Sequence, residues 1–164
     1  MKILVFSDSH SSISFMRRCV ASVKPDMLIH LGDYYDDGET IHEEYPYIDF
    51  YQVPGNCDRY RCPPEAREIM VIHARGPKLY MTHGHRHCVK QTLGMLLADA
   101  RREEAQAVLY GHTHIPDCHQ EADGLWVLNP GSCGGSGSAG IIEVEDRKIC
   151  ACYLIRQSDL EGMK

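Results

Sequence analysis

The chain has 164 residues, of which 43% are hydrophobic and 24% are charged. This length and balance predict one soluble globular domain over residues 1–164, with a real core and no room for a second domain. The formal net charge of −6 argues against an extended DNA or RNA partner, because such proteins usually present a basic face, but it leaves a small anionic substrate open.

The N-terminal sequence predicts a cytoplasmic protein with no membrane partner. Met1 and Lys2 lead directly into an apolar run over residues 3–6, which is far too short for a secretory signal or a membrane span. We therefore expect the eight cysteines to be reduced, and their spacings do not match a zinc finger. Cys150 and Cys152 lie two apart in a strand-like run and are expected to share a buried face.

The first thirty or so residues predict a strand–helix–strand unit. A buried strand is expected over residues 2–7 and a second over 27–31. Between them, apolar side chains recur at helical spacing, Ser11 or Ser12 could cap the helix, and Pro25 ends it. The recurring positions are Ile13, Met16, Val20 and Val23.

The middle of the chain alternates between loops and regular elements. The acidic, tyrosine-rich segment 34–47 has no clear period and is interpreted as a surface loop that could contain a short helix. Strands are expected over 49–53, 68–74 and 78–82, with a loop over 59–64 and a turn at 75–77. A helix is expected over about 88–104, with Val89, Leu93, Leu96 and Ala100 on one face.

The second half of the chain is mostly β. A buried strand over 107–110 is followed by strands near 117–121, 125–128, 139–145 and 148–155, which look antiparallel. Turns are expected at Asp123–Gly124 and Asp146–Arg147. The pattern predicts a layered α/β fold in which two sheets pack face to face with helices outside.

Five short motifs follow apolar runs, and each carries side chains that bind metal ions. In chain order they are Asp8-Ser9-His10, Gly32-Asp33, Gly55-Asn56-Cys57-Asp58, Thr82-His83-Gly84-His85 and Gly111-His112-Thr113-His114. Their carboxylate, amide and imidazole groups are sufficient in number and kind for two adjacent divalent ions. If the five runs are strands of one sheet, the motifs meet at the carboxyl edge, where open α/β sheets place their sites.

Each motif has an ordinary structural explanation when it is taken alone. Asp8 and His10 could be a cap and a surface histidine, and they would reach one ion together if the chain stays extended between them. Gly32-Asp33 and Gly55-Asn56 could be simple turns. Five such motifs, each at the end of a strand, favour a binuclear metal centre over five coincidences.

The order D-x-H, G-D, G-N-x-D, G-H and G-H-x-H resembles the calcineurin-like metallophosphoesterase superfamily, over residues 3 to about 133. The compact length and the Asn129-Pro130-Gly131-Ser132 motif resemble its small bacterial and archaeal phosphodiesterase branch. The resemblance implies a four-layer α-β-β-α sandwich of two mixed sheets. It also implies that one ion is held by Asp8, His10 and His114, the second by Asn56, His83 and His112, and that Asp33 bridges both.

The resemblance further implies hydrolysis of small phosphodiesters, by in-line attack of a hydroxide that bridges the two ions. Asp33, Asn56 and His83 would be catalytic through the ions that they hold, and Asp58 would orient the site from behind them. The mixed ligands favour Mn²⁺, with Fe, Zn²⁺ or Ni²⁺ as alternatives. The expected partner is a small phosphorylated substrate.

Cys57 departs from the pattern of the wider superfamily, in which many phosphatases carry a histidine there that helps the leaving group depart. A thiol is a poorer general acid, so the change argues against a protein phosphatase and leaves the general acid unassigned. His85 is a candidate for that role. Substrate contacts are predicted for Cys57, Arg59 and His85, with Arg86 as a second arginine that could bind phosphate.

The remaining histidines and aromatic residues have structural interpretations. His30 and His73 lie within strands, and His87 is expected at the surface. Trp126 is expected in the core, although it could wall a base-binding pocket. The tyrosines at 34, 35, 45 and 47 are expected to face solvent or an interface.

Two other functions remain open. The chain could be a non-catalytic scaffold that keeps the fold, as in the retromer subunit similar to this family, but no ligand of the motif set is missing here. It could also be a nuclease, although its acidic charge predicts poor activity on polymers. Exposed strand edges and the tyrosine-rich segment make a homo-oligomer plausible.

Overall fold

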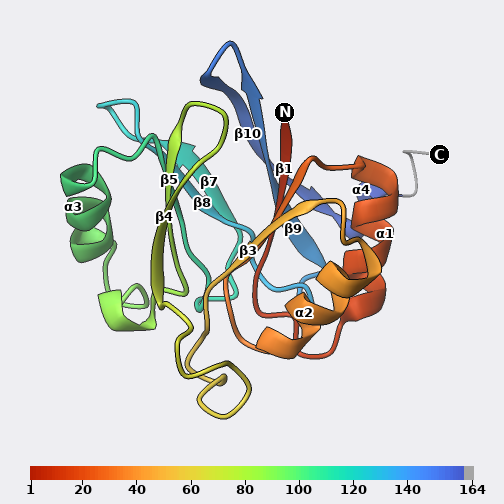
Figure 1. The fold of residues 1–164 in the computed structure, drawn as a ribbon. Helices are drawn as coiled ribbons and strands as arrows, with labels where there is room; N and C mark the ends of the chain where they lie inside the picture. The colour runs from red at the N-terminus through yellow and green to blue at the C-terminus, as the bar shows by residue number, and fades with distance from the viewer. Residues whose placement is uncertain (161–164) are drawn as a thin grey trace.

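Two five-stranded sheets pack face to face in the computed structural model, which describes residues 1–160 (Figure 1). The first sheet has the strand order β10-β9-β1-β2-β3 and the second has the order β4-β5-β6-β8-β7. The first comprises β1 (Lys2–Phe6), β2 (Met27–His30), β3 (Asp49–Gln52), β9 (Ser138–Glu145) and β10 (Lys148–Arg156). The second comprises β4 (Ile69–His73), β5 (Lys78–Thr82), β6 (Ala107–Leu109), β7 (Asp117–Gln120) and β8 (Trp126–Asn129).

Helices cover the outer face of each sheet, so the predicted α-β-β-α sandwich is confirmed. On the first sheet lie α1 (Ile13–Val23), α2 (Tyr35–Glu44) and the short α4 (Gln157–Leu160). On the second lies α3 (Gly94–Arg102), preceded by a single 3₁₀ turn over His85–His87. Within residues 1–160, no helix combines the length and the apolar character that crossing a membrane would require.

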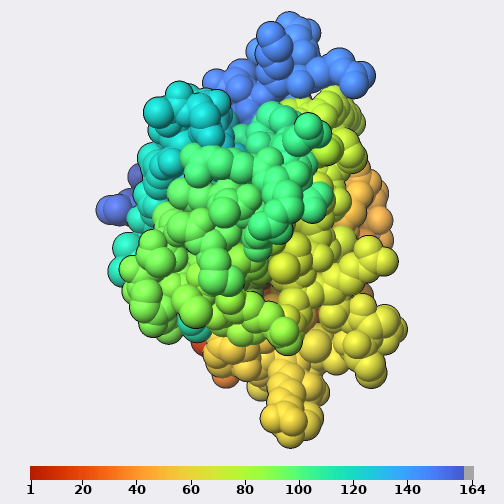
Figure 2. Space-filling model, turned by 90° about the vertical axis from the view of Figure 1, so that its left-hand side faces the viewer, coloured from red at the N-terminus to blue at the C-terminus, as the bar shows by residue number. Residues whose placement is uncertain are grey.

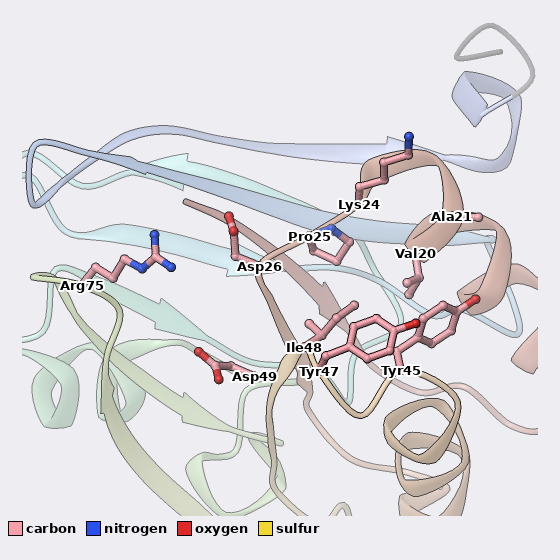
Figure 3. Close-up of a pocket in the computed structure, with 10 residues that line it drawn as sticks. All are labelled: Val20, Ala21, Lys24, Pro25, Asp26, Tyr45, Tyr47, Ile48, Asp49 and Arg75. Atoms are coloured by element: carbon pink, nitrogen blue, oxygen red, sulfur yellow. The ribbon is translucent and has the colours of Figure 1, made fainter.

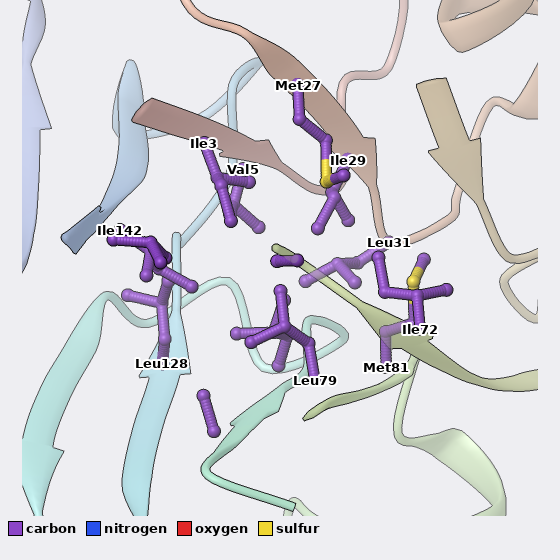
Figure 4. Close-up of a cluster of buried hydrophobic side chains, with 14 of the residues drawn as sticks. Ile3, Val5, Met27, Ile29, Leu31, Ile72, Leu79, Met81, Leu128 and Ile142 are labelled. Carbon is purple, nitrogen blue, oxygen red and sulfur yellow. The ribbon is translucent and has the colours of Figure 1, made fainter. Parts of the chain in front are cut away.

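The central strand β1 shows how the apolar runs build the layers. Its side chains alternate between two faces, and both faces are buried. Ile3 and Val5 pack between the sheets against residues such as Leu79 and Leu128, as Figure 4 shows. Leu4 and Phe6 pack outward under α1. A strand buried on both faces has an unbroken apolar sequence, and this one does.

The parallel pairing of strands determines at which edge of each sheet the five motifs lie. In the first sheet, β1, β2 and β3 are parallel, and in the second β5, β6 and β8 are parallel. Of the strands predicted to be antiparallel, β7 pairs in that way with β8 and β9 with β10, whereas β8 pairs parallel with β6 on its other side. Strand β9 is also antiparallel to β1. The carboxyl ends of the parallel strands of each sheet therefore lie at one edge of that sheet.

Segment 34–47 was interpreted as a surface loop that could contain a short helix; a helix is present, and it takes up most of the segment as α2, over residues 35–44. Its buried residues are Tyr35, Asp37, Gly38 and Ile41. A buried aspartate and a glycine on the packed face leave little hydrophobic period to detect. Gly38 allows the helix to lie close to β3, since a Cβ there would be 2.3 Å from Gln52 Oε1.

The helix predicted over about 88–104 begins six residues later, at Gly94. Cys88 has a left-handed backbone with φ 52°, which interrupts any helix at that point. Val89 is buried under the second sheet without belonging to the helix, so its contribution to the apolar stripe was coincidental. Ser12 occupies the N-cap of α1, at one of the two predicted positions, but its side chain makes no capping hydrogen bond.

The expectation that Cys150 and Cys152 share a buried face is wrong. The pairing register of β10 with β9 shifts between Ile149 and Ala151, which is the mark of a β-bulge. Cys152 packs against the core between the sheets, whereas Cys150 is exposed.

Candidate metal centre

The five motifs lie just past the ends of β1, β2, β3, β5 and β6. These strands are divided between the two sheets, so the expectation of a single sheet edge is wrong. The site instead forms where the carboxyl edges of both sheets face one another. Residues from opposite halves of the chain are therefore brought together across the sandwich.

One group of candidate ligands comes from the loops after β1, β2 and β6. Asp8, His10, Asp33 and His114 each offer one ligand atom, and these atoms all lie within 4.8 Å of one another. The closest measured pair is His114 Nε2 and Asp8 Oδ1, at 3.1 Å. This spacing is compact enough for a single ion to contact several of them.

A second group surrounds His83. Its Nε2 lies 3.2 Å from Asn56 Oδ1 and 3.6 Å from Asp33 Oδ1. The His112 ring lies beside it, with ring centroids 5.1 Å apart. Asp33 therefore stands between the two groups, close to His83 on one side and to His10 and His114 on the other.

His83 presents a lone pair to this space. Its Nδ1 lies 2.7 Å from the backbone oxygen of Leu31, and because a carbonyl only accepts, Nδ1 must carry the proton. When the ring is neutral, Nε2 has a lone pair, which faces the oxygens of Asn56 and Asp33 with no hydrogen to share. Three acceptor atoms converging in this way fit a cation among them.

Asp8 supports the same conclusion independently. Its Oδ2 accepts from Ser7 Oγ at 2.6 Å and from the backbone N–H of His112 at 3.1 Å. Its Oδ1 is buried and makes no hydrogen bond among the described residues, although the His114 Nε2 lies 3.1 Å away. A buried carboxylate oxygen without a donor is unfavourable in a protein unless a cation satisfies it.

The backbone at the site is unusual. Five candidate ligands have positive φ angles: Asp8 at 52°, His10 at 44°, Asp33 at 57°, His112 at 67° and His114 at 60°. Non-glycine residues rarely adopt this conformation, and its cost is typically found at functional sites. Asp8 and His10 therefore reach the same group from a tight turn and not, as predicted, from an extended chain.

Two glycines of the motifs are required by close packing. A Cβ at Gly55 would lie 2.2 Å from Asp33 Oδ1, and a Cβ at Gly111 would lie 1.9 Å from Ser7 Oγ. Any side chain at Gly55 would displace the carboxylate that both groups share. The glycine in Gly55-Asn56 thus belongs to the site and does more than permit a turn.

Asp58 fixes the loops without entering the ligand groups. Its buried carboxylate accepts hydrogen bonds from the backbone N–H groups of Asp33, Tyr34, Tyr35 and Gly55, at 2.7 to 3.0 Å. These bonds tie the loop after β2 to the loop after β3. Asp58 is therefore placed behind Asp33, as a residue that positions it.

The surroundings of His112 and Asp33 keep these two side chains in the forms that bind metals. Burial lowers the pKa of His112 to about 4, with help from the neighbouring His83, so its ring is neutral near pH 7. Burial acts to raise the pKa of Asp33, but His83 and the N–H of Cys57 outweigh it and hold the pKa below the ordinary range. Neutral imidazoles and ionised carboxylates are the forms that bind metals.

The predicted substrate contacts lie around this centre. Cys57 is exposed, and its N–H donates to Asp33 Oδ1 at 2.9 Å. Burial of the thiol and the charge of Asp33 raise the pKa of Cys57 to about 11, so it stays protonated. His85 lies beside the centre, with its ring centroid 5.5 Å from that of His83 and 6.1 Å from that of His112. Arg86 is paired with Glu68 at 2.9 Å, whereas Arg59 is exposed.

Several supporting residues were not anticipated. Ser132 Oγ donates to the backbone oxygen of Asp8 at 2.8 Å, and Asn129 Nδ2 donates to that of Gly111 at 3.1 Å. The Asn129–Ser132 motif thus braces the loops after β1 and β6. The motif itself was visible in the sequence, but nothing local indicated which loops it would contact.

The histidines and aromatic residues outside the site are partly as predicted. His30 is buried, with its Nε2 3.2 Å from Ser9 Oγ, and His73 is exposed on its strand. His87 was expected at the surface, which is wrong: it is buried, and its Nε2 lies 3.3 Å from Asp99 Oδ2. The prediction for Tyr35 is also wrong, because it is buried in α2, whereas Tyr47 is 83% exposed. Trp126 is half-buried and packs against the core.

The largest cavity described is remote from this centre. It has a volume of about 640 Å³ and is lined by Lys24, Asp26, Tyr45, Asp49 and Arg75, among others, as Figure 3 shows. Asp26 and Asp49 lie at the amino ends of β2 and β3, whereas the motifs follow the carboxyl ends. A second cavity of about 620 Å³ is lined in part by Gly55, Asn56 and His85, so it adjoins the candidate centre.

Comparisons with known proteins agree with the geometry. A family model described as the calcineurin-like phosphoesterase superfamily domain matches residues 1–147. A probable metallophosphoesterase of Bacillus subtilis strain 168, YsnB, is 32% identical over 135 residues, covering 80% of this chain and 75% of the relative. The phosphodiesterase MJ0936 of Methanocaldococcus jannaschii is 25% identical over 166 residues, covering 90% and 96%. Vps29 of Chaetomium thermophilum shares the fold, with a TM-score of 0.74 at 20% identity, covering 93% of this chain and 87% of that one.

Proposed function

The chain belongs to the calcineurin-like phosphoesterase superfamily, and on that basis we propose that it is a metal-dependent hydrolase of small phosphodiesters. The name of the archaeal relative supports the diester preference. Cys57 supports it as well, because the protonated thiol is a weak replacement for the histidine of many monoester phosphatases.

We propose that two divalent ions, with Mn²⁺ preferred, bind between the sheets. Asp8, His10 and His114 would hold one ion, Asn56, His83 and His112 the other, and Asp33 both. When bound, such ions neutralise phosphoryl charge and lower the pKa of a coordinated water. Carboxylate, amide and imidazole ligands together suit Mn²⁺, Fe, Zn²⁺ or Ni²⁺.

Other features of the protein would position the ligands, admit the substrate and protonate the leaving group. Asp58 and Leu31 O hold Asp33 and His83 in position through the backbone and Nδ1 contacts described above. The exposed Asn56, His10 and His114 leave the centre open on one side, where the substrate phosphate would enter. His85 lines the cavity that adjoins this side and stays the candidate for protonating the leaving oxygen, although burial lowers its pKa.

The observation that carries this proposal is the position of Asp33, within reach of both ligand groups. The test is hydrolysis of bis-p-nitrophenyl phosphate, together with metal content, for the wild type, Asp33→Ala and His83→Ala. Both variants should lose bound metal and at least a hundredfold in kcat/KM. His73→Ala, which removes an exposed histidine outside the site, is the matched control and should change neither.

A non-catalytic scaffold is the alternative favoured by the Vps29 likeness, which concerns the fold alone. Metal binding without turnover of phosphodiesters or phosphomonoesters would support it. A nuclease would instead show greater activity on oligonucleotides than on mononucleotide esters, with a steep decline as salt is raised. The net charge of −6 leads us to expect the opposite preference. The cytoplasmic location and a homo-oligomeric state stay predictions from the sequence.

A further inference from the structure

The cavity beside the candidate metal centre has a distinct composition. It measures about 620 Å³, and Asn56 and His85 form its wall nearest the centre. Much of the remainder comes from the segment between β3 and β4, which contributes Pro63, Pro64 and Ala66. This segment projects from the bottom of the molecule in Figures 1 and 2. The cavity is within the size range of small-molecule sites, which are about 300–1,000 Å³.

Arg59 is the free cation of this cavity. Arg86, which also lines it, is paired with Glu68 at 2.9 Å, and the nearby Arg61 is paired with Asp36 at 2.8 Å. Arg59 makes no ion pair with any residue of the described range 1–160, and its guanidinium lies 5.5 Å from the exposed Tyr60 ring. A guanidinium that needs no partner inside the protein is available to an anionic oxygen or to the face of a planar ring.

We propose that this cavity binds the organic ester group of the substrate and that the preferred group is a nucleoside. The inference rests on the proposed function, because the phosphate itself must sit at Asn56 and His83. Pro63, Pro64 and Ala66 supply a rigid apolar wall for a planar base, and Arg59 supplies the charge for an oxygen of the phosphoryl group. Inorganic phosphate can use Arg59 but has no organic group to place against the apolar wall.

The first test measures binding and not turnover. Calorimetry on the metal-loaded protein should give a Kd for thymidine 5′-monophosphate at least tenfold below that for inorganic phosphate. Ala66→Trp, which fills the cavity, should raise the nucleotide Kd at least tenfold and change the phosphate Kd less than twofold. Arg67→Trp is the matched control, because Arg67 is an exposed neighbour that does not line the cavity, and it should change neither Kd.

The second test compares two diesters that share one leaving group, thymidine 5′-(p-nitrophenyl phosphate) and methyl p-nitrophenyl phosphate. Ala66→Trp should lower kcat/KM at least tenfold for the nucleoside ester only. Arg59→Ala, a change at an exposed residue, should lower kcat/KM severalfold for both diesters, because both carry the phosphoryl oxygens that Arg59 would contact. A wild type that hydrolyses neither diester would defeat the proposed function. A wild type that hydrolyses both equally, or an Ala66→Trp protein that loses both equally, would defeat the subsite alone.

A second inference rests on a pair of thiols on the other side of the fold. Cys118 on β7 and Cys152 on β10 have their sulfurs 3.4 Å apart, although 34 residues separate them. These strands are edge strands of different sheets. Both side chains are half-buried, so a small oxidant can reach them.

We infer that Cys118 and Cys152 form a reversible disulfide that joins the two sheets when a peroxide is present. The Cys118 thiolate attacks one peroxide oxygen, the O–O bond breaks, and Cys118 sulfenic acid and hydroxide form. Cys152 sulfur then attacks the Cys118 sulfur, the S–O bond breaks, and water leaves with the Cys152 proton. The side-chain hydrogen bond with Cys152 lowers the pKa of Cys118, which favours Cys118 as the attacking sulfur.

Treatment with hydrogen peroxide followed by intact mass and peptide mapping tests this inference. The wild type should lose about 2 Da through one Cys118–Cys152 bridge, and its melting temperature should rise by about 10 °C until dithiothreitol reverses both changes. Cys118→Ser and Cys152→Ser should each abolish the bridge. Cys150→Ser, at an exposed thiol of the same strand, should leave it intact. Stepwise addition of oxygen to single cysteines, or a bridge between other cysteines, would overturn the assignment.

Discussion

The backbone N–H of Asp33 donates to the carboxylate of Asp58 at 2.9 Å. Asp58, which is not a candidate ligand, therefore fixes the position of Asp33, which lies between the two ligand groups. Asp58 follows β3 and Asp33 follows β2, and these strands are parallel neighbours. The pair shows that the candidate centre depends on contacts between loops as much as on its ligands. It also leads to the first of four predictions.

Asp58→Asn should destabilise the protein by about 2–4 kcal/mol, because an amide oxygen cannot replace a buried carboxylate that accepts four backbone hydrogen bonds. Its affinity for Mn²⁺ should fall about 10- to 100-fold, since Asp33 loses its support. Urea unfolding and metal titration measure the two effects. Asp36→Asn, which breaks an exposed pair with Arg61, should cost less than about 1 kcal/mol and leave metal affinity unchanged.

Asp8→Asn should separate stability from metal binding. Without metal, the buried Oδ1 of Asp8 makes no hydrogen bond within residues 1–160 and has the His114 ring nitrogen 3.1 Å away, so removing the charge should leave the unfolding temperature equal or higher. When the Mn²⁺ concentration is a hundred times the wild-type Kd for Mn²⁺, binding should add about 2.7 kcal/mol to the free energy of unfolding of the wild type. The variant should lack this gain. Thermal unfolding with and without Mn²⁺ measures both. A large loss of stability in the metal-free variant would show that Asp8 stabilises the fold and that its Oδ1 is not held in place for a metal ion.

Gly55→Ala should disrupt the candidate metal centre through a steric clash, without removing any ligand atom. Its Cβ would lie 2.2 Å from Asp33 Oδ1, so either the loop or the carboxylate must move. We expect Mn²⁺ affinity to fall at least tenfold, as it does when a supporting contact of a ligand is lost. Gly94→Ala is the control: its Cβ would meet only Thr92 Oγ1 at 3.7 Å, and alanine favours the helix by up to about 1 kcal/mol. Metal titration should show no change for that variant.

Stability should decline between pH 6.5 and pH 4 because of His30. Burial lowers the pKa of His30 to about 4 in the folded protein, whereas the unfolded chain has the ordinary value of 6.5. As pH falls through 6.5, His30 binds a proton in the unfolded state but not yet in the folded state, so the free energy of unfolding decreases. The decrease is complete below pH 4 and amounts to roughly 3 kcal/mol.

Urea unfolding of metal-free protein across this range, compared with His30→Gln, isolates the histidine from the carboxylates. The variant should lack that part of the decline. Parallel curves for the two proteins would mean that His30 does not titrate in this window. The Nδ1 of His30 accepts from Gly32 N–H at 3.3 Å, so the variant should also be less stable at pH 7.

The order of elements was predictable where a local signal was strong. The run over residues 3–6 is apolar at every position, and it became a strand buried on both faces. The extent of helix α2 was not predicted, because its packed face contains Asp37 and Gly38, whose burial depends on a partner strand that local sequence does not specify. The helix start at Gly94 was missed for the converse reason, since Val89 satisfies the helical period without belonging to the helix.

The sequence by itself determined which chemical groups are available to bind metal ions. Asp8, Asp33, Asn56 and His83 stand in motifs whose side-chain chemistry is fixed by residue type and whose places at strand ends follow from local patterning. Only the tertiary structure decided that the strands belong to two sheets, that Asp58 supports Asp33 from behind, and that Cys118 meets Cys152. Those relationships join residues far apart in the chain, and burial between layers, which no local pattern encodes, is what brings them into contact.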